Sequence, residues 1–134
     1  MNPKILLADD HKIIRDVLAR LITESITDDL SIATNGKEAL NKLEQEQFDL
    51  LITDLNMPVM DGLELVRNLS NQNIEVKTLV LTMRDDAETI EALMQFKIDG
   101  YVLKEGDTEE FKNAVEMILK NGQYFSDEVK PFLK

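Results

Sequence analysis

The chain has 134 residues, of which 43% are hydrophobic and 31% charged, a composition that fits one globular domain and excludes the disordered and membrane-embedded classes. Its 26 acidic and 15 basic residues give a net charge of −11, which argues against a chain that binds a nucleic-acid backbone or an anionic membrane by itself. The absence of cysteine and the single histidine exclude a disulfide framework, a thiolate metal site and a multi-histidine metal site.

The first part of the chain alternates short apolar runs with segments of helical periodicity. An apolar run at residues 5–8 predicts a strand close to the first residue. Because no signal-peptide pattern precedes this run, and no apolar run approaches the ~18 residues of a membrane span, we expect a cytoplasmic protein. An apolar stripe predicts a helix over about residues 12–25, and a weak strand follows at 30–34. Asn35 and Glu38 then form a capping-box-like start of a second helix.

The middle of the chain repeats the alternation around a well-marked loop. Residues 48–53 predict a third strand that ends in Asp54. A proline and an Asp-Gly pair within residues 55–62 predict a loop, because both disfavour a continuing helix or strand. A third helix follows, and residues 78–82 predict a fourth strand.

The last third contains two more helices and one more strand. The aspartates at 85–86 are candidate caps of a fourth helix, and residues 100–103 predict a fifth strand that ends at Lys104. Asp107 is the candidate cap of the last helix, and the tail at 123–134 has no clear periodicity.

Five successive strand–helix units predict an α/β fold with a five-stranded parallel sheet and five helices on both of its faces. Right-handed crossovers leave few topologies, and we expect the flavodoxin-like order 2-1-3-4-5. In that order a crevice lies between strands 1 and 3, so residues just past the carboxyl ends of the strands should meet there.

Five polar residues stand at these strand ends. They are Asp9 and Asp10 after the first strand, Asp54 after the third, Thr82 at the end of the fourth and Lys104 after the fifth. Each alone has an ordinary explanation as a cap, a turn residue, a strand residue or a surface charge. His11 is read as a first-turn helix residue and not as a ligand. Because all five polar residues stand at four strand ends around one crevice, together they indicate a functional site.

The chemistry of this set favours a hard cation and a phosphoryl group. Neighbouring carboxylates repel one another unless a cation lies between them, and oxygen ligands favour Mg²⁺, Mn²⁺ or Ca²⁺. A carboxylate in such a place can attack a phosphoryl group to form an aspartyl phosphate. The Lys104 ammonium and the Thr82 hydroxyl would then bind the remaining phosphoryl oxygens.

Four stretches, with the spacing between them, resemble the receiver (response regulatory) domain of two-component response regulators. They are residues 5–10, 54–62, 79–82 and 100–104. The resemblance spans about Lys4 to Asn121 and implies the CheY-like form of the flavodoxin-like fold. It implies a receiver domain over 1–122 and, over 123–134, a C-terminal tail or the start of a linker.

The resemblance also implies roles for individual residues. Asp54 would be the phosphoacceptor, loaded from a sensor histidine kinase or a phosphotransfer protein. Mg²⁺, with Mn²⁺ as a second option, would be bound directly by Asp10, Asp54 and the backbone carbonyl of Asn56, and by Asp9 mostly through water. The chain would be a phosphoacceptor switch that assists its own phosphorylation and dephosphorylation, and not an enzyme.

The remaining implied roles concern the switch and its lifetime. Thr82 would move toward the phosphoryl group, Lys104 would pair with it, and Tyr101 would be the switch aromatic that turns inward. Asn56 and Arg84 would flank the path of the hydrolytic water and tune the phosphoryl lifetime. One departure from the family is Glu105, where many receivers have a proline after the lysine, so a cis bond there is not assumed.

Details of the sequence resemble the LuxR/NarL-type transcriptional regulators. These details are Asp9-Asp10-His11, Leu81-Thr82-Met83 and residues 122–129. In that subfamily a linker and a DNA-binding helix-turn-helix domain follow the receiver, which implies DNA binding through a domain absent from this chain, and a homodimer that forms on phosphorylation. The alternative is a stand-alone receiver that acts by protein contact or as a phosphorelay shuttle.

Two rivals from other classes fit the residues less well. A flavodoxin-like electron carrier needs a hydroxyl- and glycine-rich phosphate loop after strand 1, where this chain has Asp9 and Asp10. A haloacid-dehalogenase-type phosphatase needs a second aspartate two residues after the nucleophile, where this chain has Asn56.

Overall fold

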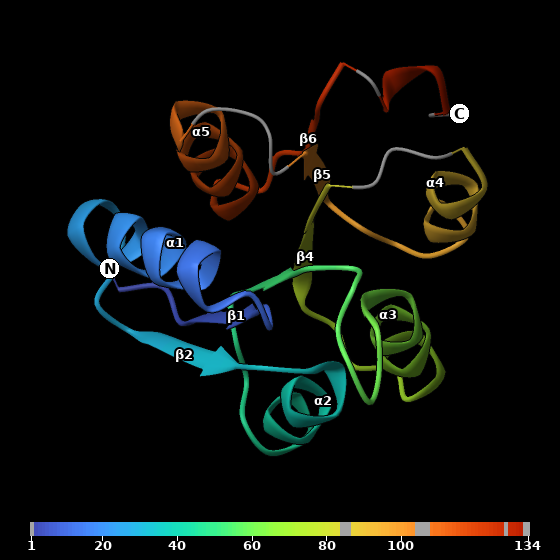
Figure 1. Ribbon diagram of the computed structural model, residues 1–134, viewed down its shortest axis with the longest axis horizontal. Helices are drawn as coiled ribbons and strands as arrows, with labels where there is room; N and C mark the ends of the chain where they lie inside the picture. Colours follow the sequence, from blue (N-terminus) through green and yellow to red (C-terminus); the bar gives the residue numbers. More distant parts are fainter. Residues whose placement is uncertain (1, 84–86, 104–107, 128, 133–134) are drawn as a thin grey trace.

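A computed structural model describes residues 2–83, 87–103, 108–127 and 129–132, which form a layered α/β fold (Figure 1). The described residues build one sheet in the order β2-β1-β3-β4-β5-β6, in which every neighbouring pair is parallel. The strands are β1 (Ile5–Ala8), β2 (Leu30–Ala33), β3 (Leu50–Thr53), β4 (Lys77–Thr82), β5 (Gly100–Leu103) and β6 (Tyr124–Phe125). The central strands are buried on both faces, as a parallel sheet covered by helices requires.

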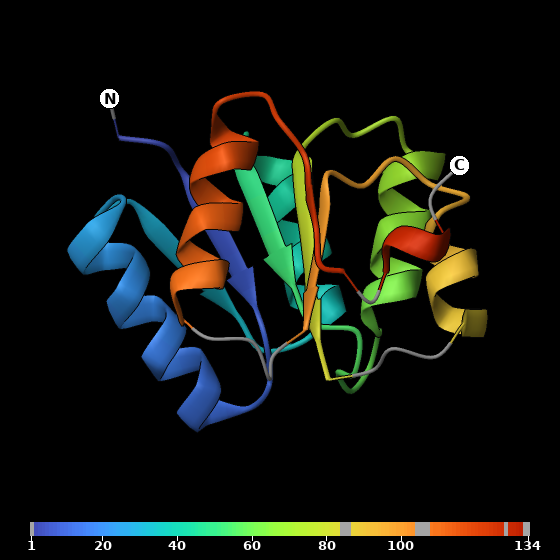
Figure 2. The ribbon, with the colours of Figure 1, turned by 90° about the horizontal axis from the view of Figure 1, so that it is seen from above.

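The helices cover the two faces of the sheet unequally. They are α1 (Lys12–Ser25), α2 (Gly36–Gln45), α3 (Gly62–Asn71), α4 (Ala87–Leu93) and α5 (Thr108–Leu119). Helices α1 and α5 lie on one face and α2, α3 and α4 on the other (Figures 1 and 2). Within the described ranges, no helix combines the length and the apolarity needed to cross a membrane.

The predicted strand order is confirmed for the first five strands, but the predicted number of strands is wrong. A sixth strand, β6, pairs with β5. The Tyr124 N–H donates to the Asp99 carbonyl at 3.0 Å, and the Ser126 N–H donates to the Tyr101 carbonyl at 2.9 Å. A strand of two residues is too short to show an alternating apolar pattern, so the sequence alone does not predict β6. It forms because β5 would otherwise leave an unpaired edge of backbone N–H and C=O groups.

Several predicted boundaries can be compared with the structure directly. The expected helix at 12–25 is confirmed as α1. The capping of α2 is also confirmed, because the Asn35 side chain accepts from the Glu38 N–H at 2.8 Å. The third strand is shorter than the predicted 48–53, beginning at Leu50. The candidate caps at 85–86 and Asp107 lie outside the described residues.

The segment after α5 packs back onto the domain. Val129 is fully buried and belongs to the core cluster that contains Ile90, Leu93 and Tyr101. The 3₁₀ helix η1 (Lys130–Phe132) contacts α4. In Figure 2 this segment, drawn in red, runs along the edge of the sheet and ends beside α4. The α4–β5 side of the domain is therefore covered by the chain itself.

Candidate functional site

The acidic site begins where two neighbouring strands end. Asp9 follows β1 and Asp54 follows β3, and the register pairs Ala8 with Thr53, so the two aspartates leave the sheet side by side. The Asp54 N–H donates to the Ala8 carbonyl at 3.0 Å, which extends the ladder by one step. Asp9 is 1% exposed and Asp54 2%, so the fold holds two carboxylates almost entirely out of bulk water.

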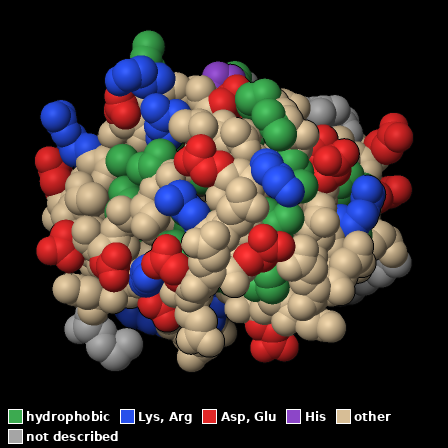
Figure 3. Space-filling model, turned by 90° about the horizontal axis from the view of Figure 1, so that it is seen from below, with side chains coloured by type: hydrophobic (Ala, Val, Ile, Leu, Met, Phe, Trp, Pro, Cys, Tyr) green, Lys and Arg blue, Asp and Glu red, His purple; other side chains and the backbone are tan. Residues whose placement is uncertain are grey.

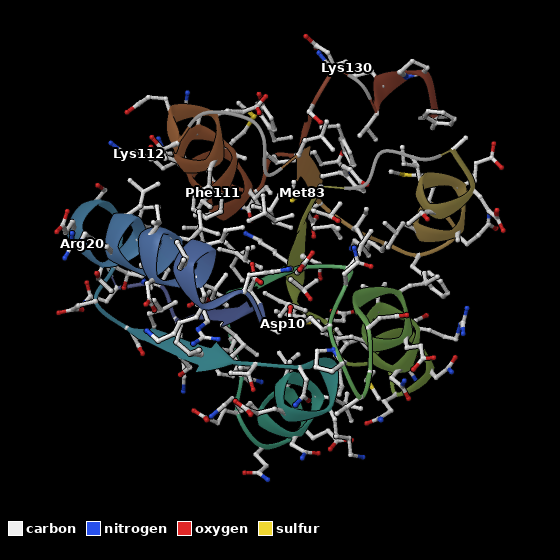
Figure 4. All side chains as sticks on the ribbon, viewed as in Figure 1. Asp10, Arg20, Met83, Phe111, Lys112 and Lys130 are labelled. Atoms are coloured by element: carbon white, nitrogen blue, oxygen red, sulfur yellow. The ribbon has the colours of Figure 1, made fainter. Side chains whose placement is uncertain are left out.

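Asp10 and His11 complete a cluster with these two residues. One ligand atom from each of Asp9, Asp10, His11 and Asp54 lies within 4.8 Å of all the others. Figure 4 shows Asp10 near the middle of the view, between the ribbons of α1 and α3. The structure thus brings together the three aspartates that the sequence placed at the carboxyl ends of strands 1 and 3.

His11 is the member that sequence reasoning missed. It occupies the N-cap position of α1 instead of the first turn, and its Nδ1 lies 3.1 Å from Asp9 Oδ1. The same nitrogen lies 3.4 Å from Asp10 Oδ1 and 3.4 Å from Asp54 Oδ2. Its position directly after Asp9-Asp10 was the available signal, but that adjacency says nothing about where the ring points.

Backbone hydrogen bonds orient the buried carboxylates. Asp54 Oδ1 accepts from the Leu55 N–H at 2.7 Å, and its Oδ2 is the oxygen nearer to His11. Asp9 Oδ1 accepts from the His11 N–H at 2.9 Å. The Arg15 guanidinium donates to the Asp9 carbonyl at 3.1 Å, which ties α1 to the end of β1.

The loop between β3 and α3 is closed tightly beside Asp54. The Gly62 N–H donates to the Leu55 carbonyl at 3.0 Å, and the Gly36 N–H donates to the Met60 carbonyl at 2.9 Å. A Cβ at Gly62 would lie 2.3 Å from the Asp54 carbonyl oxygen, so glycine allows this close approach. The Asp61 side chain caps α3 by accepting from the Glu64 N–H at 2.9 Å. These contacts fix both ends of the loop.

Of the other predicted site residues, some lie in the described part of the chain and others do not. Thr82 is the last residue of β4 and is fully buried, and Tyr101 is fully buried on β5 opposite Val80. Asn56 is exposed in the loop after Asp54. Lys104 and Arg84 lie outside the described residues, so their roles remain predictions, and the backbone after Lys104 at Glu105 is likewise not described.

The donor set of this cluster fits a hard divalent cation. Its carboxylate oxygens are the ligands that Mg²⁺ prefers, and their mutual repulsion is relieved when a cation lies between them. The Asp10 side chain is 34% exposed and that of His11 51%, so the cluster opens to solvent on one side. The histidine (purple) reaches the molecular surface in Figure 3, where acidic and basic side chains are interspersed.

Comparison with known proteins gives a consistent result. The family model described as the response regulator receiver domain matches residues 5–116. The chain is 29% identical over 127 residues to the transcriptional regulatory protein DegU of Brevibacillus brevis, covering 94% of this chain and 54% of that protein. It is 30% identical over 132 residues to the nitrate/nitrite response regulator protein NarL of Escherichia coli K12, covering 96% of this chain and 60% of that protein.

A solved structure agrees with these sequence relatives. The crystal structure of a LuxR-family two-component response regulator from Aurantimonas sp. SI85-9A1 superposes with a TM-score of 0.85 at 25% identity. The match covers 98% of this chain and 94% of that one. The chain spans 54% of the length of DegU and 60% of the length of NarL.

Proposed function

Because the chain belongs to the response regulator receiver domain family, we propose that Asp54 is its phosphoacceptor, loaded from the phosphohistidine of a sensor histidine kinase or a phosphotransfer protein. The observation that carries this proposal is the buried Asp54 carboxylate, held beside two other acids at the ends of β1 and β3. The chain then acts as a switch whose phosphorylation state is read by another part of the system.

The geometry of Asp54 suits an attacking carboxylate. The Leu55 N–H fixes Oδ1, so Oδ2 is the oxygen turned toward the cluster. In the transfer, a carboxylate oxygen forms the bond to phosphorus while the P–N bond of the phosphohistidine breaks. The imidazole of the donor, protonated on its other ring nitrogen, keeps the electron pair of that bond and leaves as a neutral ring, and the product is an acyl phosphate.

Three groups of this chain would hold the cation, with a fourth acting through water. We assign direct binding to the Asp10 and Asp54 carboxylates and the Asn56 carbonyl, and binding through water to Asp9. When bound, Mg²⁺ supplies positive charge to the transferring phosphoryl oxygens. Mn²⁺ has the same ligand preference and would serve in its place.

The signal would leave the site through β4 and β5. We propose that Thr82 and Lys104 bind phosphoryl oxygens and that Tyr101 follows the movement of Thr82. Tyr101 pairs with Val80, two residues before Thr82, so a shift at the end of β4 has a short path to β5. The Tyr101 carbonyl accepts from the Ser126 N–H, and Tyr101 belongs to the same core cluster as Val129. The segment after α5 is therefore in direct contact with the proposed switch residue.

We propose transcription regulation in the cytoplasm as the output, because DegU is named a transcriptional regulatory protein and NarL a response regulator protein. DNA would be bound by a helix-turn-helix domain not included in this chain, with 1–122 as the receiver and 123–134 as the start of a linker. We propose a homodimer that forms on phosphorylation, so sedimentation should show stronger self-association of the phosphorylated chain than of the unphosphorylated chain. A native reading frame that ends near residue 134 would favour the stand-alone receiver instead.

Intact mass after incubation with Mg²⁺ and acetyl phosphate tests the acceptor. The wild-type chain should gain one phosphoryl group, and Asp54→Asn should gain none. Asp61→Asn is the matched control, because it removes a carboxylate from the same loop while asparagine still caps α3. A phosphoryl gain in Asp54→Asn equal to that of the wild type would refute the assignment.

A further inference from the structure

His11 places an imidazole nitrogen among the same three carboxylates that would hold the cation. Its Nδ1 lies 3.1 Å from Asp9 Oδ1, 3.4 Å from Asp10 Oδ1 and 3.4 Å from Asp54 Oδ2. The backbone of His11 is fixed as well, because its N–H donates to Asp9 Oδ1 at 2.9 Å. The backbone hydrogen bond to Asp9 thus places the His11 ring beside the three carboxylates.

These distances match the spacing of neighbouring donors around one metal ion. In an octahedron with metal–ligand bonds of about 2.1 Å, adjacent donor atoms lie about 3 Å apart. The three Nδ1–oxygen distances are within half an ångström of this value. The nitrogen therefore lies at donor spacing from one oxygen of each of the three carboxylates.

An imidazole donor changes which ions such a site prefers. Mg²⁺ is a hard cation that takes oxygen ligands, whereas imidazole suits the first-row transition metals. We propose that His11 is a metal ligand that raises the affinity of this site for borderline divalent ions such as Co²⁺ and Zn²⁺ relative to Mg²⁺. This inference rests on the proposed function, since it concerns the same cation site.

Metal binding through Nδ1 depends on which ring nitrogen of His11 carries the proton. An ionised carboxylate oxygen only accepts, so the 3.1 Å contact between Nδ1 and Asp9 Oδ1 is a hydrogen bond only in a form of the ring that carries a proton on Nδ1. Binding of a metal through Nδ1 needs the other neutral form of the ring, in which the proton is on Nε2 and the Nδ1 lone pair is free. Because the ring is half-exposed, solvent can take the proton from Nδ1 and return one to Nε2, so the two forms interconvert without a change in net charge.

Isothermal titration of the chelator-stripped 134-residue chain with CoCl₂ and with MgCl₂ at one pH tests this inference. His11→Gln should weaken Co²⁺ binding about tenfold or more, while the Mg²⁺ dissociation constant should change by less than about threefold. Lys12→Gln is the matched control, because it alters the neighbouring exposed side chain and leaves the imidazole in place. With Mn²⁺ bound, electron spin echo modulation should show coupling to a nitrogen that disappears in His11→Gln.

The outcomes separate this inference from the proposed function. Equal losses of Co²⁺ and Mg²⁺ affinity in His11→Gln would mean that the ring only positions the carboxylates, and would overturn the ligand role. Unchanged Co²⁺ affinity would overturn it too. A wild-type chain that binds Co²⁺ through His11 but fails to bind Mg²⁺ would leave the inference standing and contradict the Mg²⁺-dependent function.

Discussion

Val59 adopts a backbone conformation that its side chain opposes. Its φ is 70°, in the left-handed region, and the Met60 N–H donates to the Pro58 carbonyl at 2.7 Å across it, which is the hydrogen bond of a γ-turn. A β-branched residue rarely occupies this region. The Val59 side chain is 80% exposed, so packing does little to offset the strain. We therefore expect Val59→Gly to stabilise the protein.

The magnitude follows from two opposing terms. Removing the Cβ from a left-handed residue relieves about 1–2 kcal/mol of strain in the folded state. Glycine loses more backbone entropy on folding, which opposes this gain by about 0.5–1 kcal/mol. The difference between these terms lies between about 0 and 1.5 kcal/mol, and its middle part, about 0.5–1 kcal/mol, is equivalent to an increase in Tm of about 2–4 °C. Val59→Ala keeps the Cβ and should give a smaller gain.

Urea unfolding of the wild type, Val59→Gly and Val59→Ala measures the two differences under identical conditions. Mg²⁺ titration of each variant checks that the loop beside Asp54 still supports the cation site. If Val59→Gly lowered the free energy of unfolding, or if Val59→Ala gained as much as Val59→Gly, backbone strain at this position would be the wrong explanation.

Two further predictions concern the C-terminal segment and a surface ion pair. Val129→Ala should lower the free energy of unfolding by about 1–2.5 kcal/mol, because Val129 is fully buried. The control Val17→Ala, at a half-exposed site on α1, should change the free energy of unfolding by less than about 0.5 kcal/mol. Equal effects of the two substitutions in urea unfolding would contradict the packing of the C-terminal segment. The Lys4 ammonium donates to the Glu46 carboxylate and holds the pKa of that carboxyl below its ordinary value. The pair therefore stabilises the folded protein at pH values above the ordinary pKa, and this contribution is lost as the pH falls through the lowered pKa of Glu46. Glu46→Gln should therefore lower Tm slightly at pH 7 and not at pH 2, and a Tm loss that persists at pH 2 would point to lost packing instead.

Much of the fold could be predicted because its signals are local. The apolar stripe of residues 12–25 gave the helix, and Asn35 with Glu38 gave the start of the next one, since both patterns depend on neighbours within one or two turns. Parallel strands with right-handed crossovers then leave few arrangements. That restriction is why Asp9 and Asp54, 45 positions apart in the sequence, could be expected at one place.

The sequence by itself therefore determined the strand order of the first five strands and the meeting of three aspartates at their carboxyl ends. Only the tertiary structure decided the orientation of the His11 ring, the positive φ of Val59 and the pairing of β6 with β5. Each of these depends on contacts between segments that are distant in the chain: the ring faces Asp54 from β3, the γ-turn lies in a loop tied to α2, and β6 forms against the free edge of β5. Local sequence patterns do not predict such contacts, because the groups that make them become neighbours only when the sheet has assembled.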